Sequence, residues 1–192
     1  VLRRKGKKPG TQEKRGRFNV KKTIKDRPQE VENRETFGHW ELDTMVSSRG
    51  QSKGCLATFV ERKTRFYIAI KMDDRSKDSM FLAISSLYNT LTSKLLKTFT
   101  VDRGKEFACF EQVETEFGIP MYFADAYAAW QRGSNENSNG LLREFFPKKT
   151  DLAKVTLDKL TEALVLINNR PRKCLGFKTP FDMFKHEIKK LI

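Results

Sequence analysis

The spacing of hydrophobic residues divides the chain into strand-like stretches and stretches with a helical period of three to four residues. Segments rich in β-branched and aromatic residues predict strands, which are expected at residues 39–48, 54–64, 65–74, 95–102 and 119–125. Helices are expected at residues 76–93, 108–118, about 134–146, 156–169 and from residue 179 onward.

Turn and cap residues support these boundaries. Ser76 is a candidate N-cap, and Gly118 ends the helix that precedes it. Thr179 followed by Pro180 is typical of a helix start. The resulting order, βββαβαβαα, predicts an α/β fold with a mixed five-stranded sheet flanked by helices.

Basic residues are concentrated at the N-terminus. Residues 1–35 hold 13 Lys or Arg and 5 Asp or Glu, in a chain whose formal net charge is +14. Because this segment has no apolar period, it predicts a flexible basic arm or linker before one folded unit over residues 36–192. Such an arm can neutralise phosphates without reading bases, and an inert linker is an equally open alternative. The charge favours a polyanion over a membrane surface, because no basic amphipathic helix with aromatic anchors is present.

Cysteine and histidine usage disfavours a structural zinc site. Cys55, Cys109 and Cys174 are too far apart for a CxxC pair, and only His39 and His186 accompany them. Unpaired thiols suit a reducing cytosol. No apolar run approaches the roughly 18 residues of a membrane span, so no membrane partner and a cytoplasmic location are expected. The N-terminus does not carry the apolar core of a signal peptide. Because the chain begins with Val instead of Met, we expect it to be a fragment.

A strand with an internal acid is the first candidate for chemistry. At a period of two, Asp43 shares one face with Glu41 and Met45, while Trp40 and Leu42 point the other way. Asp is disfavoured inside strands. An isolated strand Asp is more often an edge residue than a ligand, so this position alone decides nothing.

Two further acids lie at the ends of predicted elements. Asp102 ends an apolar strand at the edge where open sheets place ligands, although Asp-x-Gly is also an ordinary turn. Glu106 follows it as either a helix-capping acid or a minor participant. Glu136 lies in the first turn of a helix, where an acid also complements the helix dipole.

The helix that begins near residue 134 has an unusual first part. Its early positions include Asn135, Asn137, Asn139 and Gly140, which are weak helix formers. A surface shaped for contact explains this better than helix stability does.

Together, two strand acids and one helix acid on a mixed sheet would converge oxygen ligands for Mg²⁺ or Mn²⁺. Two such ions suit phosphodiester chemistry.

Four segments match a known family: WELD (40–43), VDRGKEF (101–107), residues 122–152 and NNRPRKCLGFKTP (168–180). In their order and sequence they resemble the catalytic domain of bacterial transposases of the insertion sequence 30 family. More distantly, the chain is similar to retroviral integrase cores, which have the ribonuclease H-like fold. Arg103 stands where the family usually has Asn.

The resemblance implies a function and a site. Asp43, Asp102 and Glu136 would be the catalytic and metal-binding triad, with two Mg²⁺ or Mn²⁺ ions, and residues 36–192 would form the catalytic core. The reaction would be cleavage at the ends of a mobile element followed by strand transfer. The partners would be double-stranded DNA, as terminal inverted repeats and target, and further copies of the protein in a bacterial, nucleoid-associated setting.

Several polar residues are candidates for DNA contact, and a solvated surface charge is an equally open explanation for each basic one. They are Arg132, Arg143, Lys148, Lys149, Arg170, Arg172, Lys173 and Asn139. Two other functions are left open by the residues: a ribonuclease H-like nuclease that cuts without joining, and a DNA-binding module without catalysis.

Overall fold

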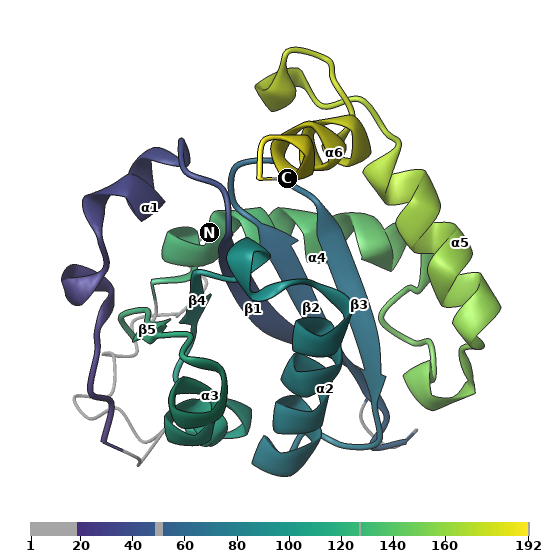
Figure 1. The fold of residues 1–192 in the computed structure, drawn as a ribbon. Coiled ribbons are helices and arrows are strands. Elements are labelled where there is room, and N and C mark those ends of the chain that lie inside the picture. Colours follow the sequence, from purple (N-terminus) through teal and green to yellow (C-terminus); the bar gives the residue numbers. More distant parts are fainter. Residues whose placement is uncertain (1–18, 49–51, 127, 192) are drawn as a thin grey trace, which may run out of the picture.

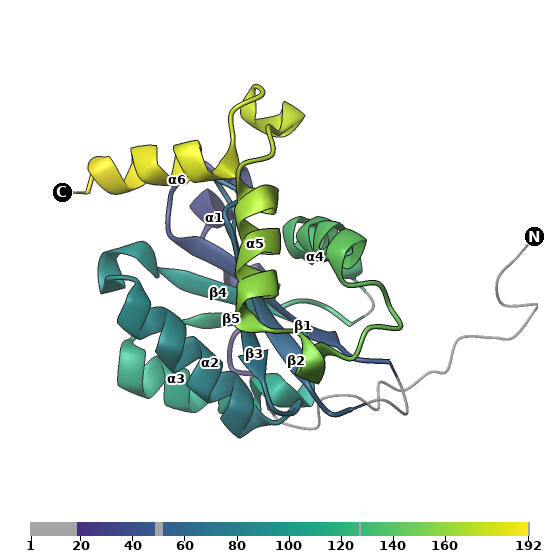
Figure 2. The same cartoon turned by 90° about the vertical axis from the view of Figure 1, so that its right-hand side faces the viewer.

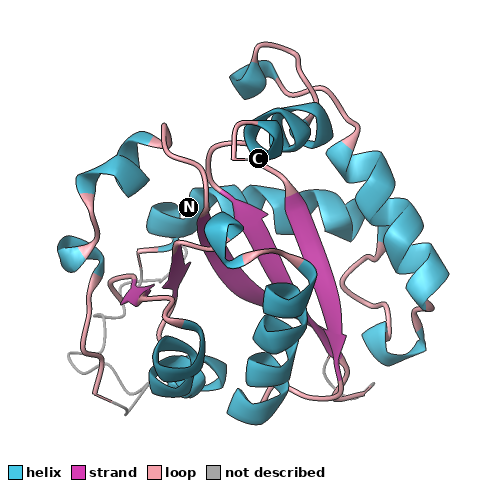
Figure 3. Cartoon of the chain, viewed as in Figure 1, coloured by secondary structure: helices cyan, strands magenta, loops and turns pink. Residues whose placement is uncertain are grey.

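A five-stranded sheet lies at the centre of the molecule, with helices against both of its faces (Figure 1, Figure 3). The computed structural model describes residues 19–48, 52–126 and 128–191. The strands are β1 (His39–Val46), β2 (Cys55–Glu61), β3 (Tyr67–Met72), β4 (Thr98–Val101) and β5 (Met121–Phe123). The helices are α1 (Gln29–Asn33), α2 (Lys77–Thr90), α3 (Phe110–Phe117), α4 (Gly133–Phe145), α5 (Leu157–Asn168) and α6 (Pro180–Lys189).

The sheet is mixed, as predicted. Its strand order is β3-β2-β1-β4-β5. The first three strands form an antiparallel meander, and β4 and β5 add to it in parallel with β1. Glu41 pairs with Thr100 across the parallel β1–β4 ladder. Two residues further on, Asp43 and Asp102 therefore come to the same edge of the sheet from neighbouring strands.

Each face of the sheet has its own core. Helices α2 and α3 cover one face, whereas α4 and α5 cover the other (Figure 2). Along β1, Trp40 and Leu42 are fully buried in the α2/α3 core, and Met45 is buried in the α4/α5 core. The predicted alternation of this strand is confirmed, and it turns Asp43 toward α4.

The predicted helix boundaries are confirmed by their caps. The Ser79 backbone N–H donates to Ser76 Oγ at 3.1 Å at the start of α2, and Thr179 caps α6 in the same way. Gly118 ends α3 in the left-handed conformation, with φ 68°. A side chain is strained there, which explains the choice of glycine.

Part of the segment predicted as a flexible arm is folded. Val31, in α1, is fully buried, and its carbonyl accepts a bond from Arg62 Nε at 3.0 Å. Thr23 forms a parallel bridge with Phe123 at the edge of the sheet. The folded unit therefore begins before residue 36. These few long-range contacts order a segment whose charge-rich composition had predicted flexibility. The remainder of the predicted arm, residues 1–18, lies outside the described residues.

No helix in the described part of the chain is long and apolar enough to cross a membrane.

Candidate active site

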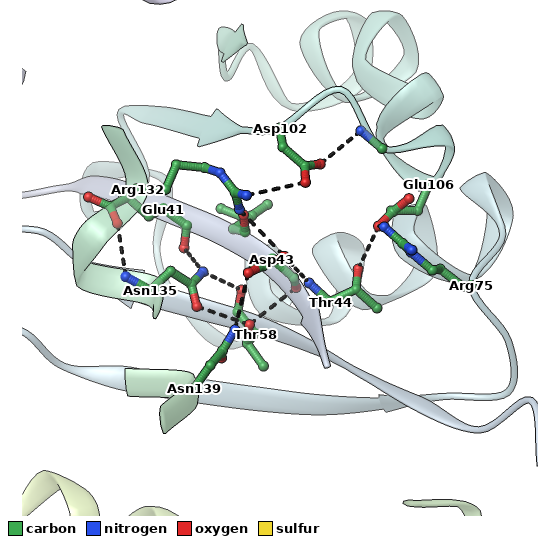
Figure 4. A network of polar contacts seen from close by, with 12 residues as sticks. Glu41, Asp43, Thr44, Thr58, Arg75, Asp102, Glu106, Arg132, Asn135 and Asn139 are labelled. Atoms are coloured by element: carbon green, nitrogen blue, oxygen red, sulfur yellow. Dashed lines mark hydrogen bonds and ion pairs between the residues drawn. The ribbon is translucent and has the colours of Figure 1, made fainter. Parts of the chain in front are cut away.

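Two of the three predicted acids meet around one guanidinium group. Arg132 Nη1 lies 3.4 Å from Asp43 Oδ1, and Nη2 lies 3.2 Å from Asp102 Oδ2. Figure 4 shows Arg132 reaching between the two side chains from the segment before α4. The structure thus brings together a carboxylate from β1 and one from the end of β4.

Asp43 is held from several sides. Its Oδ1 accepts the Thr44 N–H at 2.8 Å, and its Oδ2 accepts the Asn139 amide at 3.2 Å. Burial raises the pKa of the Asp43 carboxyl, the positive charge of Arg132 opposes this rise, and the negative charge of Asp102 adds to it. The hydrogen bonds therefore fix the position of this carboxylate, and the neighbouring cation Arg132 favours its ionised form against the effect of burial.

Asp102 is fixed by the turn that follows it. Its Oδ1 accepts the Gly104 N–H at 2.8 Å. A Cβ at Gly104 would lie 2.8 Å from that same oxygen and would overlap the Glu106 carboxylate. The Asp-x-Gly turn and the candidate site are thus one structure, in which glycine lets the backbone come close to two carboxylates.

Glu136 does not join this pair in the structure. It is exposed in the first turn of α4, four residues after Arg132 and three before Asn139, both of which contact the aspartates. Across residues 19–48, 52–126 and 128–191, no three His, Cys, Asp or Glu side chains gather closely enough to hold a metal ion. The Asp43 and Asp102 oxygens suit a hard cation, and Arg132 supplies positive charge between them. Glu136 as third ligand stays a prediction.

The start of α4 is anchored to the sheet by Asn135, a role that the sequence analysis missed. Its backbone N–H donates to Glu41 Oε2 at 2.9 Å, and its amide Nδ2 donates to the Glu41 carbonyl at 2.9 Å. Thr58 Oγ1 donates to the Asn135 side-chain oxygen at 3.1 Å. Glu41 is fully buried and paired with Arg62. The one available signal was that Glu41 shares a strand face with Asp43.

Comparison with known proteins shows the family of the chain. The family model described as "Integrase core domain" matches residues 33–129. The chain belongs to this family. The chain is 39% identical over 176 residues to the transposase InsI of insertion sequence element IS30A from Escherichia coli K12. This match covers 91% of the chain and 45% of that protein. The chain is also 37% identical over 166 residues to the transposase of IS4351 from Bacteroides fragilis, covering 86% and 50%. The chain thus spans about half the length of these curated relatives.

Solved structures share the fold of this integrase core. The catalytic core domain of BIV integrase superposes with a TM-score of 0.62 at 19% identity, over 82% of this chain and all of that one. The catalytic core of HTLV-2 integrase, in complex with magnesium in a trimeric form, gives 0.58 at 18% identity, over 76% and 95%. The expected ribonuclease H-like fold is confirmed.

Glu106 is a further acid at the site of the integrase core. It is fully buried, and its Oε1 accepts from Thr44 Oγ1 at 3.0 Å and from Arg75 Nε at 2.6 Å. Its Oε2 is buried without a hydrogen-bond partner. These contacts place Glu106 beside Thr44 and Arg75, and Gly104 brings it close to Asp102. Its two roles considered from sequence, a helix-capping acid or a minor participant in the site, stay predictions.

The predicted DNA contacts do not form one group in the integrase core. Arg132 and Asn139 face the aspartates, and Asn139 also accepts from the Tyr67 hydroxyl at 2.7 Å. Arg143 donates to the Val46 carbonyl at 2.8 Å, and Arg170 forms an exposed ion pair with Glu144. The other basic candidates are exposed or half-buried: Lys148, Lys149, Arg172 and Lys173.

Proposed function

We propose that the chain is the catalytic domain of a DNA transposase, which cleaves DNA at the ends of a mobile element and joins the freed strand to a target. One observation carries the proposal: Asp43 and Asp102, from neighbouring parallel strands, converge on one cationic group. The proposal is supported by family membership and by relatives named as transposases. The net charge of +14 suits double-stranded DNA as the partner.

The proposed metal ligands are Asp43, Asp102 and Glu136, holding two Mg²⁺ or Mn²⁺ ions. When bound, two such ions would activate the attacking oxygen and stabilise the leaving one. The protein's part is to present the oxygens. Asn139 and the Thr44 N–H fix the Asp43 carboxylate, and the turn at Gly104 fixes Asp102. Arg132, which contacts both carboxylates, would have to leave its place between them for a metal to bind.

Two in-line displacements make up the proposed reaction. In the first, water attacks a phosphodiester at the element end, forms a new P–O bond and releases a 3′ hydroxyl. In the second, that hydroxyl attacks a phosphodiester of the target, and a target 3′ hydroxyl leaves. Each step exchanges one P–O bond for another, so no external energy source is required.

Terminal inverted repeats and target DNA are the proposed substrates. We propose a homo-oligomer that acts on paired ends, at the bacterial nucleoid.

The test is an Asp102→Asn variant of the full-length protein, incubated with labelled element-end DNA and Mg²⁺ or Mn²⁺. We expect cleavage and joining to fall at least about 1,000-fold, with DNA affinity within about threefold of wild type. Asp158→Asn is the matched control, because Asp158 is exposed at the start of α5.

The wild-type products separate the alternatives. Joined strands support the transposase, cleaved but unjoined strands support a nuclease, and bound but intact DNA supports a module without catalysis. Equal activity of Asp102→Asn and wild type would contradict the assignment of the triad.

A further inference from the structure

A cavity of about 390 Å³ opens beside the first turns of α4, apart from the candidate active site. Three arginines and three polar residues of α4 line it: Arg34, Arg65, Arg172, Ser134, Asn137 and Ser138. We call this the arginine pocket. Its volume falls within the roughly 300–1,000 Å³ of small-molecule sites. Asp43, Asp102 and Glu136 are not part of its lining.

Segments far apart in the sequence build the arginine pocket. Arg34 follows α1, Arg65 lies in the turn between β2 and β3, and Arg172 lies in the loop after α5. Arg34 and Arg65 both have left-handed backbones, with φ 60° and 63°. Such conformations are uncommon for residues other than glycine and persist where the surrounding structure holds them. The fold therefore gathers these cations through several independent elements.

The positive charge of the pocket has no counterpart in its lining, which contains no Asp or Glu. Burial lowers the pKa of the Arg65 guanidinium, and the positive charge of Arg34 lowers it further. Burial likewise lowers the pKa of Arg172, whose Nε is buried without a hydrogen-bond partner. Within the described ranges, no ion pair involves any of these three arginines. Like charges gathered in this way are stabilised by an anion.

We propose that the arginine pocket binds a phosphate group, supplied by the backbone of the DNA that the proposed reaction acts on. Guanidinium groups suit phosphate because they donate in a planar fork. Ser134 and Ser138 add hydroxyl donors, and the start of α4 adds the positive end of a helix dipole. The same turns carry Glu136, so a phosphate held here positions DNA relative to the candidate site. The DNA source rests on the proposed function, and a free phosphate is the other source of this chemistry.

Cys174 provides a direct readout, because it lines the pocket and is exposed. Cys55 and Cys109 are buried, and burial raises their pKa values to about 11 and about 12. We therefore expect iodoacetamide to alkylate Cys174 selectively. In metal-free buffer, where no cleavage occurs, we expect a 30-base-pair duplex to slow this alkylation at least fivefold. Inorganic phosphate and a mononucleotide are tested alongside the duplex.

Arg65→Gln and Arg172→Gln test the pocket itself. We expect each to weaken duplex binding about three- to tenfold and to reduce the salt slope of the affinity by about one, as the loss of a phosphate contact predicts. Lys178→Gln removes an equal charge from an exposed position of the same loop as Arg172, and its affinity should stay within twofold. If Arg65→Gln fails to fold by circular dichroism, Arg34→Gln replaces it.

The outcomes separate the sources and can overturn the proposal. If inorganic phosphate protects Cys174 and the variants bind duplex normally, the phosphate chemistry stands and its source is a free phosphate. If neither duplex nor phosphate protects Cys174, the pocket does not bind phosphate. If only the duplex protects Cys174 and the arginine variants bind it like Lys178→Gln, the protection does not come from these arginines and the proposal fails. Failure of the triad, seen as activity in Asp102→Asn, would leave these metal-free binding readouts unchanged.

Discussion

At the scale of single residues, the decisive side chain is Arg132. Its guanidinium contacts Asp43 and Asp102, and it also donates to the Leu42 carbonyl at 3.2 Å. Two carboxylates that converge repel each other, and a shared cation removes that repulsion. Arg132 therefore stabilises the same arrangement that a divalent ion would. A metal ion bound as proposed would compete with this guanidinium for one pair of carboxylates.

This competition predicts the behaviour of Arg132→Ala. With the guanidinium removed, Mn²⁺ affinity at pH 8 should rise about tenfold or more, because the displaced pair interaction at an effective dielectric constant of 20 is worth up to about 4 kcal/mol. Binding is measured from the electron paramagnetic resonance signal of free Mn²⁺, without DNA. Arg143→Ala is the control, since Arg143 contacts backbone carbonyls instead, and its affinity should be unchanged. Equal or weaker Mn²⁺ binding by Arg132→Ala would rule out competition.

At the scale of elements, the start of α4 shows why weak helix formers are found there. The N-cap residue, Arg132, makes no side-chain capping bond, so tertiary contacts hold the first turn. Asn135 and Ser138 are buried, and Asn139 bonds to Asp43 and Tyr67. The amides thus bond to the sheet instead of stabilising the helix locally. Sequence reasoning predicted a surface for DNA at these positions, but it could not identify Asn135 as an anchor, because its partners lie 77 and 94 residues away.

Asn135→Ala should destabilise the protein by roughly 2–4 kcal/mol, because it leaves buried carbonyl and hydroxyl groups of Glu41 and Thr58 without their partner. Urea unfolding followed by circular dichroism measures the change, and an unchanged slope confirms that the unfolded state is the same. Asn89→Ala, on the exposed side of α2, is the matched control and should change stability by less than about 0.5 kcal/mol. If the two variants were equally stable, the anchor would carry no energetic weight.

At the scale of the whole molecule, local patterns predicted the element order and the mixed sheet, because alternation and helical spacing are properties of neighbouring residues. They also predicted that the two strand acids would converge, and Asp43 and Asp102 meet around Arg132. They missed the folded segment around α1, where a single buried residue, Val31, anchors a highly charged stretch. The Arg132 bridge and the arginine pocket were also missed. Both depend on contacts between distant segments that no local pattern encodes.

His39 connects β1, β4 and α1, and its burial is expected to make the stability of the whole molecule depend on pH. It lies on β1, its Nδ1 is 2.8 Å from Thr98 Oγ1 of β4, and its Nε2 is 3.4 Å from Glu30 Oε1 of α1. Burial lowers its pKa to about 4, against the attraction of Glu30 and with the help of Lys97, Arg62 and Arg27. The unfolded imidazole, with a pKa near 6.5, binds a proton that the folded one does not. Stability is therefore lost as the pH falls from about 6.5 toward 4.

Between pH 7 and pH 5, this one group should lower the free energy of unfolding by about 2 kcal/mol. His39→Gln removes that contribution, so its stability should fall less over the same interval than that of the wild type. His186→Gln serves as the control, because His186 is exposed on α6 and should leave the pH dependence of the wild type intact. Urea unfolding at pH 7, 6 and 5 measures all three proteins. Parallel stability curves for His39→Gln and wild type would show that the buried imidazole does not set the acid sensitivity of the fold.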